Sequence, residues 1–165
     1  MDNVLKNFNL QVDGKGYAGE AEEIELPKLV LIMESFRAGG MDASKSIDMG
    51  MEEMEATITL SGYDPALLKL WGVTSAAVPL TARGALQSED GTVTAAVINM
   101  QAQFFDLDLG TWKPGDKAPK KMKCKVSYYK MTIGGEETIE IDVPNMVRKI
   151  GGVDQLEQMR AALGI

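Results

Sequence analysis

The chain has 165 residues, 45% of them hydrophobic, so it can bury a core and is not of a disordered type. It has no histidine and one cysteine, Cys124. These absences exclude Ser-His-Asp and Cys-His catalysis, Cys/His zinc sites and an intrachain disulfide. The formal net charge of -7 disfavours nucleic-acid binding, which needs clustered Lys and Arg.

No targeting or membrane-spanning signal is visible. The first ten residues lack the basic and apolar regions of a signal peptide. The longest apolar run, residues 29–33, is far too short to span a bilayer. We expect a soluble protein made in the cytoplasm, without membrane anchoring.

The first third of the chain predicts strands. Asp13-Gly14 is a hairpin turn between strand-like runs. Residues 29–33, continued by Phe36, are apolar in succession, so a strand there needs cover on both faces. Either a helix or another subunit provides that cover. Residues 54–60 alternate apolar and polar, which predicts a strand with one buried face.

Two helices are predicted. In the first, Asp64 is the N-cap, Pro65 the first helical residue and Gly72 the end; Leu67, Leu68 and Trp71 form its apolar face. The second begins at Asp154 with Glu157 as a capping-box partner, has Leu156, Met159 and Leu163 on one face, and ends at Gly164.

The second half of the chain is again strand-like. Alternation is weak around Gly84 and clear in residues 98–104 and 139–143, with hairpin turns at Asp90-Gly91 and Gly134-Gly135. The apolar phase switches between residues 122–128 and 129–133, which predicts a bulge or a change of packing surface. Residues 106–121 are predicted to be a long exposed loop.

These elements predict one domain over residues 1–165. Its class is mainly β, a barrel or sandwich of antiparallel strands, with one helix between strands and one at the C-terminus.

Two glycine motifs have weak functional interpretations. Residues 14–19 match G-x-G-x-x-G, but Pro27 leaves no room for the helix that a dinucleotide site needs. Residues 39–46 resemble a P-loop, yet Ser44 replaces the required glycine and Asp42 opposes a phosphate. We expect no cofactor and no metal.

Other reactive side chains also favour structural roles. The acidic doublets at residues 22–23, 52–53 and 136–137 cannot share a proton in a strand, because strand neighbours point to opposite faces. Cys124 lies on the apolar face of its strand, as a small buried residue would. The 11 methionines fit either core filling or a subunit interface.

Several segments resemble the major tail tube proteins of contractile phages and R-type phage-tail-like bacteriocins. The similarity is carried by Glu-Ser-Phe-Arg-Ala-Gly-Gly-Met-Asp-Ala at residues 34–43 and by residues 46–52. It continues in residues 26–29 and 110–117, and in the C-terminal segments 126–130, 140–142, 145–148 and 152–160.

The resemblance implies a β-barrel-like sandwich whose six copies close into a ring, with their sheets joined into one inner barrel. Rings stack into a tube that contacts a sheath protein, a baseplate and a tail terminator. Contraction drives the tube through the target envelope, and the lumen conducts DNA or ions. The particle would be a virion tail or a bacteriocin assembled in the host bacterial cytoplasm. Acidity would suit a lumen that must not bind DNA.

We expect residues 29–51 to be the chief assembly element, since they combine the apolar run with the Arg-Ala-Gly-Gly loop. The predicted subunit-interface residues are Leu29, Leu31, Met33, Phe36, Arg37, Gly39, Gly40, Met41, Met49 and Met51.

Three alternatives remain at this stage. The first is the tube protein of a type VI secretion system, a more distant relative. The second is a small-ligand β-barrel, which needs a cavity lined by aromatic residues, although aromatics are only 6% of the chain. The third is an enzyme using carboxylates, which only isolated Asp and Glu residues support.

Overall fold

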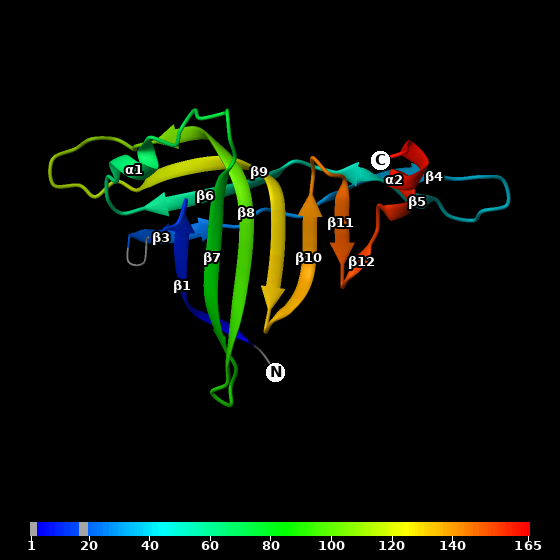
Figure 1. Ribbon diagram of the computed structural model, residues 1–165, viewed down its shortest axis with the longest axis horizontal. Coiled ribbons are helices and arrows are strands. Elements are labelled where there is room, and N and C mark those ends of the chain that lie inside the picture. Colours follow the sequence, from blue (N-terminus) through cyan, green and yellow to red (C-terminus); the bar gives the residue numbers. More distant parts are fainter. Residues whose placement is uncertain (1–2, 17–19) are drawn as a thin grey trace.

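The computed structural model describes residues 3–16 and 20–165. It contains one large sheet, a separate two-stranded hairpin and two short helices (Figure 1). The strands in chain order are β1 (Val4–Val12), β2 (Lys15–Gly16), β3 (Ala21–Glu25), β4 (Leu31–Phe36), β5 (Lys45–Met51), β6 (Met54–Leu60), β7 (Val78–Gln87), β8 (Val93–Asp108), β9 (Lys120–Ile133), β10 (Glu136–Asp142), β11 (Val147–Ile150) and β12 (Val153–Asp154). The helices are α1 (Pro65–Leu68) and α2 (Glu157–Leu163).

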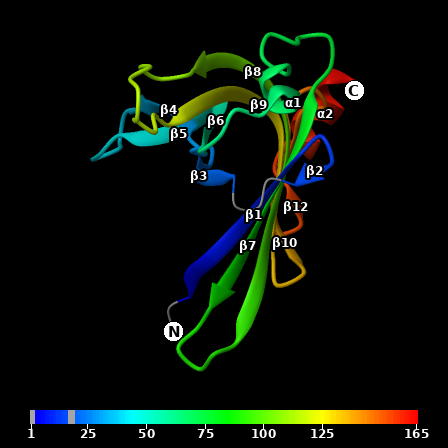
Figure 2. The same ribbon diagram turned by 90° about the vertical axis from the view of Figure 1, so that its left-hand side faces the viewer.

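Two long strands organise the large sheet. β8 has 16 residues and β9 has 14, and they pair along most of their length. Their lower halves continue sideways to β7 and β10, giving the order β12-β11-β10-β9-β8-β7-β1-β2. The upper half of β9 pairs instead with β6, which pairs with β3. In Figure 2 this upper part turns away from the plane of the lower strands, so the sheet folds over into a second layer.

A β-bulge at Ser127 explains how β9 serves both layers. Tyr128 pairs with Gln101 and Val126 pairs with Ala102, so Ser127 has no direct partner on β8. Val126 and Tyr129 are therefore both buried although they are three residues apart. Here β9 also changes neighbour, from β6 to β10. The predicted phase switch is confirmed in both senses, as a bulge and as a change of packing surface.

The core lies between the two layers and under α1. Its members are apolar and nearly inaccessible to solvent: Leu10, Val12, Met54, Ala56, Ile58, Leu60, Leu67, Val78, Leu80, Ala82, Ile98, Met100, Ala102, Phe104, Met122, Cys124, Val126, Tyr129 and Ile141. Burying a large apolar side chain stabilises a fold by about 1.5–3 kcal/mol, so this cluster is the main stabilising term.

The lower sheet has a second face, opposite the core, that is polar. Alternation along each strand places Gln11, Thr81, Asn99, Lys130, Glu140 and Lys149 in one cross-strand row on it, each the direct partner of the next. We call this side of β1 and β7–β11 the polar sheet face.

The three predicted hairpin turns are confirmed. Asp13 and Gly14 have φ of 50° and 82°, and Gly134 and Gly135 have 61° and 84°. Two successive positive φ values define the turn that matches strand twist. Gly91, with φ of 88°, lies in the turn between β7 and β8.

The two helices differ from prediction in their bounds. α1 has the predicted cap, with the Asp64 carboxylate accepting from the Ala66 N–H at 3.0 Å, but it ends at Leu68 rather than near Gly72. α2 begins after Leu156, and no side chain caps it. The predicted start at Asp154 was wrong because Asp154 ends β12 and its carboxylate accepts from the Leu156 N–H. The αL end at Gly164 is confirmed.

The apolar face of the second helix is not buried within the subunit. α2 contains no buried residue, and Met159 and Leu163 are both more than half exposed. The apolar spacing along this helix therefore predicted a face that the subunit does not cover.

The predicted loop over residues 106–121 was too long. β8 continues to Asp108 and β9 begins at Lys120, so only residues 109–119 are a loop. Asp106 and Asp108 pair across the strands with Lys123 and Lys121. Their exposed charges disguised a strand whose opposite face is apolar, with Met122 fully buried. The class predicted from sequence is confirmed: mainly antiparallel β, with one helix between strands and one at the C-terminus.

One ion pair fixes α2 to β12 and gives a pH-dependent prediction. Arg160 donates to the Asp154 carboxylate at 2.5 Å and to the Met146 carbonyl at 2.8 Å. The hydrogen bond from Arg160 lowers the pKa of Asp154 from 3.8 to about 2. A carboxylate with a lowered pKa stabilises the fold above its unfolded pKa and loses that contribution as pH falls toward the folded value.

We therefore expect Asp154→Asn to be less stable than the natural chain at pH 6, with the difference shrinking between pH 4 and pH 2 (the two pKa values bound this window). Chemical denaturation at several pH values measures it. A difference that stays constant down to pH 2 would contradict the role assigned to this pair.

Candidate assembly surface

β4, β5 and the connection between them form an arm, residues 31–51, that projects from the body (Figure 1). The two strands pair only with each other. Every residue of β4 is exposed. The doubly apolar run of the sequence therefore has no helix covering it within the described residues.

The inner arm face lies toward the body. Asp48 on this face forms an ion pair with Arg148 of β11, with 2.5 Å between the oxygen and the nitrogen. The backbone N–H of Gly50 and then the Arg148 guanidinium hold the pKa of Asp48 below its ordinary value. Leu29 and Met51, at the base of the arm, are half-buried and pack against the core. This end of the arm is anchored.

The outer arm face points away from the body and is largely apolar. Strand alternation places Ile32, Glu34 and Phe36 of β4 on one side with Lys45, Ile47 and Met49 of β5, and Glu34 is paired with Ile47 and Phe36 with Lys45. The four apolar side chains are 45–57% exposed: Ile32, Phe36, Ile47 and Met49. Such a cluster on a thin hairpin makes the outer arm face a candidate interaction surface.

The tip of the arm closes on itself. The Arg37 side chain donates to the Met41 carbonyl at 3.3 Å, and the Ala38 N–H donates to the Met41 sulfur at 3.3 Å. Gly40 has φ of 88° with open space around its Cα, so the turn requires glycine there. Gly39 has no positive φ.

The segment predicted from sequence to be the assembly element includes the whole arm, and the structure adds residues that the prediction did not name. Leu31, Met33, Phe36 and Met49 are exposed in the arm, and the loop residues form its tip. Ile32, Ile47 and the anchoring Arg148 were not selected. The alternation of residues 45–51, with Ile47, Met49 and Met51 on odd positions, could have identified Ile47. Arg148 lies 100 residues from Asp48, and no local pattern relates them.

The large sheet has two open edges in the part of the chain that the structure describes. β2 pairs only with Gln11 and Val12, so residues 4–10 of β1 lack a strand neighbour on their outer side. At the opposite edge, β12 pairs only with Lys149 and Ile150 of β11. Unpaired backbone N–H and C=O groups at an edge are a template for adding another strand.

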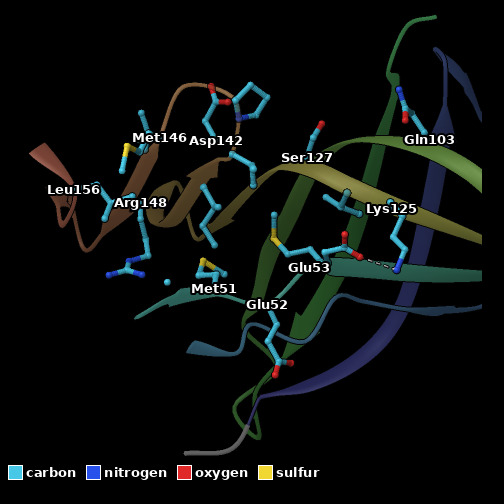
Figure 3. A pocket seen from close by; sticks show the side chains of 17 residues that line it. Met51, Glu52, Glu53, Gln103, Lys125, Ser127, Asp142, Met146, Arg148 and Leu156 are labelled. Atoms are coloured by element: carbon cyan, nitrogen blue, oxygen red, sulfur yellow. Dashed lines mark ion pairs between the residues drawn. The ribbon is translucent and has the colours of Figure 1, made fainter. Parts of the chain in front are cut away.

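A cleft of about 620 Å³ lies at the base of the arm, between the β5–β6 connection and the strands β9–β11 (Figure 3). Met51, Met146 and Leu156 form part of its wall, and its polar rim includes Gln103 and Ser127. No aromatic residue lines it. The aromatic cavity that a small-ligand β-barrel requires is therefore not found here.

The described residues contain no candidate metal site. No three His, Cys, Asp or Glu side chains among them are grouped to hold a metal ion. Lys125 pairs with Glu53 and Glu55, both at 3.1 Å. Burial raises the pKa of the Cys124 thiol to about 12, so it is an unreactive core residue, as expected.

The glycine motifs also lack the elements that nucleotide binding needs. Gly14 and Gly16 belong to a hairpin turn and to β2, and the next element is the strand β3 rather than a helix; residues 17–19 of this motif lie outside the described residues. The P-loop-like segment leads into β5, again a strand. In neither place does a helix N-terminus face the loop.

None of the helices that the structure describes is long and apolar enough to cross a membrane.

Comparison with known proteins gives consistent matches over nearly the full length. The family model of phage tail tube protein FII matches residues 2–164. The tail tube protein of Escherichia phage P2 is 34% identical over 100% of this chain and 99% of its own length. The major tail tube protein of Serratia phage KSP20 is 27% identical over 98% of this chain and 95% of its own length.

The fold is also similar to solved structures of injection systems. A chain of a sheath–tube complex from an extracellular contractile injection system, PVC, has a TM-score of 0.61 at 12% identity, covering 79% of this chain and 91% of that one. A chain from the sheath/tube terminator of the same system gives 0.62 at 12% identity, with 80% and 97% covered. At this identity the likeness concerns the fold alone.

The fold and the arm define a β-structured assembly subunit, and the family match makes the class specific. The chain belongs to the phage tail tube protein FII family. Its role is that of a structural subunit of a tail tube and not of an enzyme, in agreement with the expectation from sequence.

The exposure of the outer arm face makes a prediction about stability. Phe36 is 52% exposed and Phe104 is 1% exposed. We expect Phe36→Ala to change the free energy of unfolding of the isolated subunit by less than about 0.5 kcal/mol, and Phe104→Ala to lower it by about 3–5 kcal/mol. Urea denaturation of both variants is the measurement. A large loss in Phe36→Ala would mean that this face is packed within the subunit.

Proposed function

We propose that the chain is the subunit of the inner tube of a contractile tail, in a phage or a phage-tail-like bacteriocin. Six copies close into a ring, and rings stack into a hollow tube that sheath contraction drives through the target envelope. The observation that carries the proposal is the outer arm face, an apolar surface that nothing in the subunit covers. Exposed apolar area of this kind is stabilised when another copy buries it.

The two open edges of the sheet support ring closure. The β1 edge of one copy adds to the β11–β12 edge of the next in a head-to-tail contact. A contact between two different surfaces repeats around an axis and closes into a ring when the rotation permits. Closure removes the edges and leaves one continuous inner sheet.

In this arrangement the polar sheet face lines the passage. The opposite face carries Leu10, Leu80, Met100 and Ile141 and is buried in the core, so it cannot meet the lumen. The polar row from Gln11 to Lys149 remains wet. DNA in a phage, or ions in a bacteriocin, would pass along it without specific binding.

The arm, at one end of the long axis in Figure 1, is placed to reach beyond its own ring. We assign Leu31, Met33, Phe36, Arg37 and Met41 to contacts between copies, with Leu29 and Met51 holding the base. Gly39, Gly40 and Met49 complete the assembly element proposed from sequence.

Sheath, terminator and baseplate are the other partners that we propose. Solved structures with this fold come from a sheath–tube complex, a sheath/tube terminator and a baseplate. Assembly of the particle would take place in the host bacterial cytoplasm.

The test is a charge placed on the outer arm face. Phe36→Asp should abolish tubes in negative-stain micrographs while the subunit stays folded, because a desolvated carboxylate opposes burial at a contact. Ser75→Asp is the control, since it adds the same charge at an exposed position outside the arm. It should still form tubes.

Normal tubes from the Phe36→Asp variant would refute the role of this face. If the natural chain forms no rings or tubes, alone or with its sheath and baseplate, the proposed function itself fails.

A further inference from the structure

The polar sheet face carries equal numbers of positive and negative side chains. In the lower sheet, below the bulge at Ser127, the charged residues on this side of β1 and β7–β11 are Arg83, Lys130, Lys149, Glu137, Glu140 and Asp142. Asp154 of β12 continues the row beyond Lys149 and is paired with Arg160. The other polar residues are neutral, as at Asn99 and Gln101. The face is therefore neutral, although the chain as a whole has a net charge of -7. The acidic excess lies elsewhere.

The charges are also arranged in opposition. Lys130 is the cross-strand partner of Glu140 and pairs with Glu137 at 2.8 Å. The Lys149 Nζ lies 3.9 Å from one carboxylate oxygen of Glu140, and the Tyr128 hydroxyl donates to the other oxygen at 2.8 Å. Neighbouring charges of opposite sign cancel each other's field within a few ångströms, so little potential reaches the solvent.

Hydrogen bonds hold these groups in their charge states. The hydrogen bond with Lys130 lowers the pKa of Glu137, and the hydrogen bond with Glu137 raises the pKa of Lys130. Desolvation raises the pKa of Tyr128 to about 12, so it remains a donor. The pattern is thus maintained over the ordinary pH range.

We propose that the passage through the assembled protein has a charge-balanced wall, whose low adhesion to a polyanion comes from paired opposite charges on the polar sheet face and not from net negative repulsion. This rests on the proposed function, which puts that face at the lumen. It differs from our expectation from composition, in which the acidity of the chain suits the lumen. A balanced wall offers a phosphate chain neither a cluster of free cations to bind nor a field to oppose its entry.

The decisive variant is Glu137→Gln combined with Glu140→Gln, which leaves Lys130 and Lys149 without their carboxylates. The matched control is Glu22→Gln combined with Glu23→Gln, which removes the same two charges from β3, outside the lower sheet. A third variant, Lys130→Glu with Glu137→Lys, reverses one pair and keeps the balance.

The probe is a short fluorescent double-stranded DNA, and the readout is its anisotropy with tubes and with unassembled subunits at about 50 mM salt, where phosphate contacts are strong. The Glu137/Glu140 variant should bind at least about tenfold more tightly than the natural chain, with binding lost as salt rises. The β3 control and the pair reversal should bind no better than the natural chain.

Equal binding by the Glu137/Glu140 variant and the β3 control would overturn the proposal, because only net charge would then matter. Binding by neither would overturn it too, since the pairs would not be what prevents adhesion. If thermal melting shows that the Glu137/Glu140 variant does not fold, the variant Lys130→Glu with Glu137→Lys provides the test. DNA binding by that variant would contradict the proposal, because its pair is reversed but still balanced. If the natural chain makes no tubes, the proposed function fails, whereas anisotropy with unassembled subunits still tests the balance.

Discussion

The structure depends on the pairing of β8 with β9, which run through both layers of the sheet. Because they are shared, the upper strands β6 and β3 and the lower strands β7 and β10 enclose one core rather than two. The bulge at Ser127 allows this, since it lets β9 present apolar residues to the core on both sides of the bend. A regular β9 would direct either Val126 or Tyr129 away from the core.

The division of surfaces follows from where that core lies. With the apolar side of the lower sheet occupied, its other side is left as the polar sheet face. The arm extends beyond the layers and cannot share their burial. Its base is tied down by Leu29, Met51 and the Asp48–Arg148 pair, while its outer face stays exposed. The outer arm face therefore exposes apolar side chains of the kind that the core buries.

This arrangement suits a protein that works by assembling. A structural subunit of a tail tube needs contacts with its copies more than it needs a reactive centre, and here the charged groups serve as pairs. Arg160 with Asp154 fixes α2, Lys125 lies between Glu53 and Glu55, and Lys130 with Glu137 keeps the polar sheet face neutral. Pairs of this kind compensate charges locally, so a chain with net negative charge can still present a balanced face.

Sequence alone determined the local features of this protein. The hairpin turns at Gly14, Gly91 and Gly134, the Asp64 cap and the phase switch in β9 depend on backbone preferences and on neighbours within a few residues, so their signals are local. The doubly apolar run also identified the arm without any structure. Tertiary structure decided the rest: the strand character of residues 106–108, the late start of α2, the Asp48–Arg148 anchor and the balance of charge on the polar sheet face. These features depend on which strands lie side by side. The net charge of a sequence sums over both faces of a sheet, and only the folded sheet separates the charges of one face from those of the other.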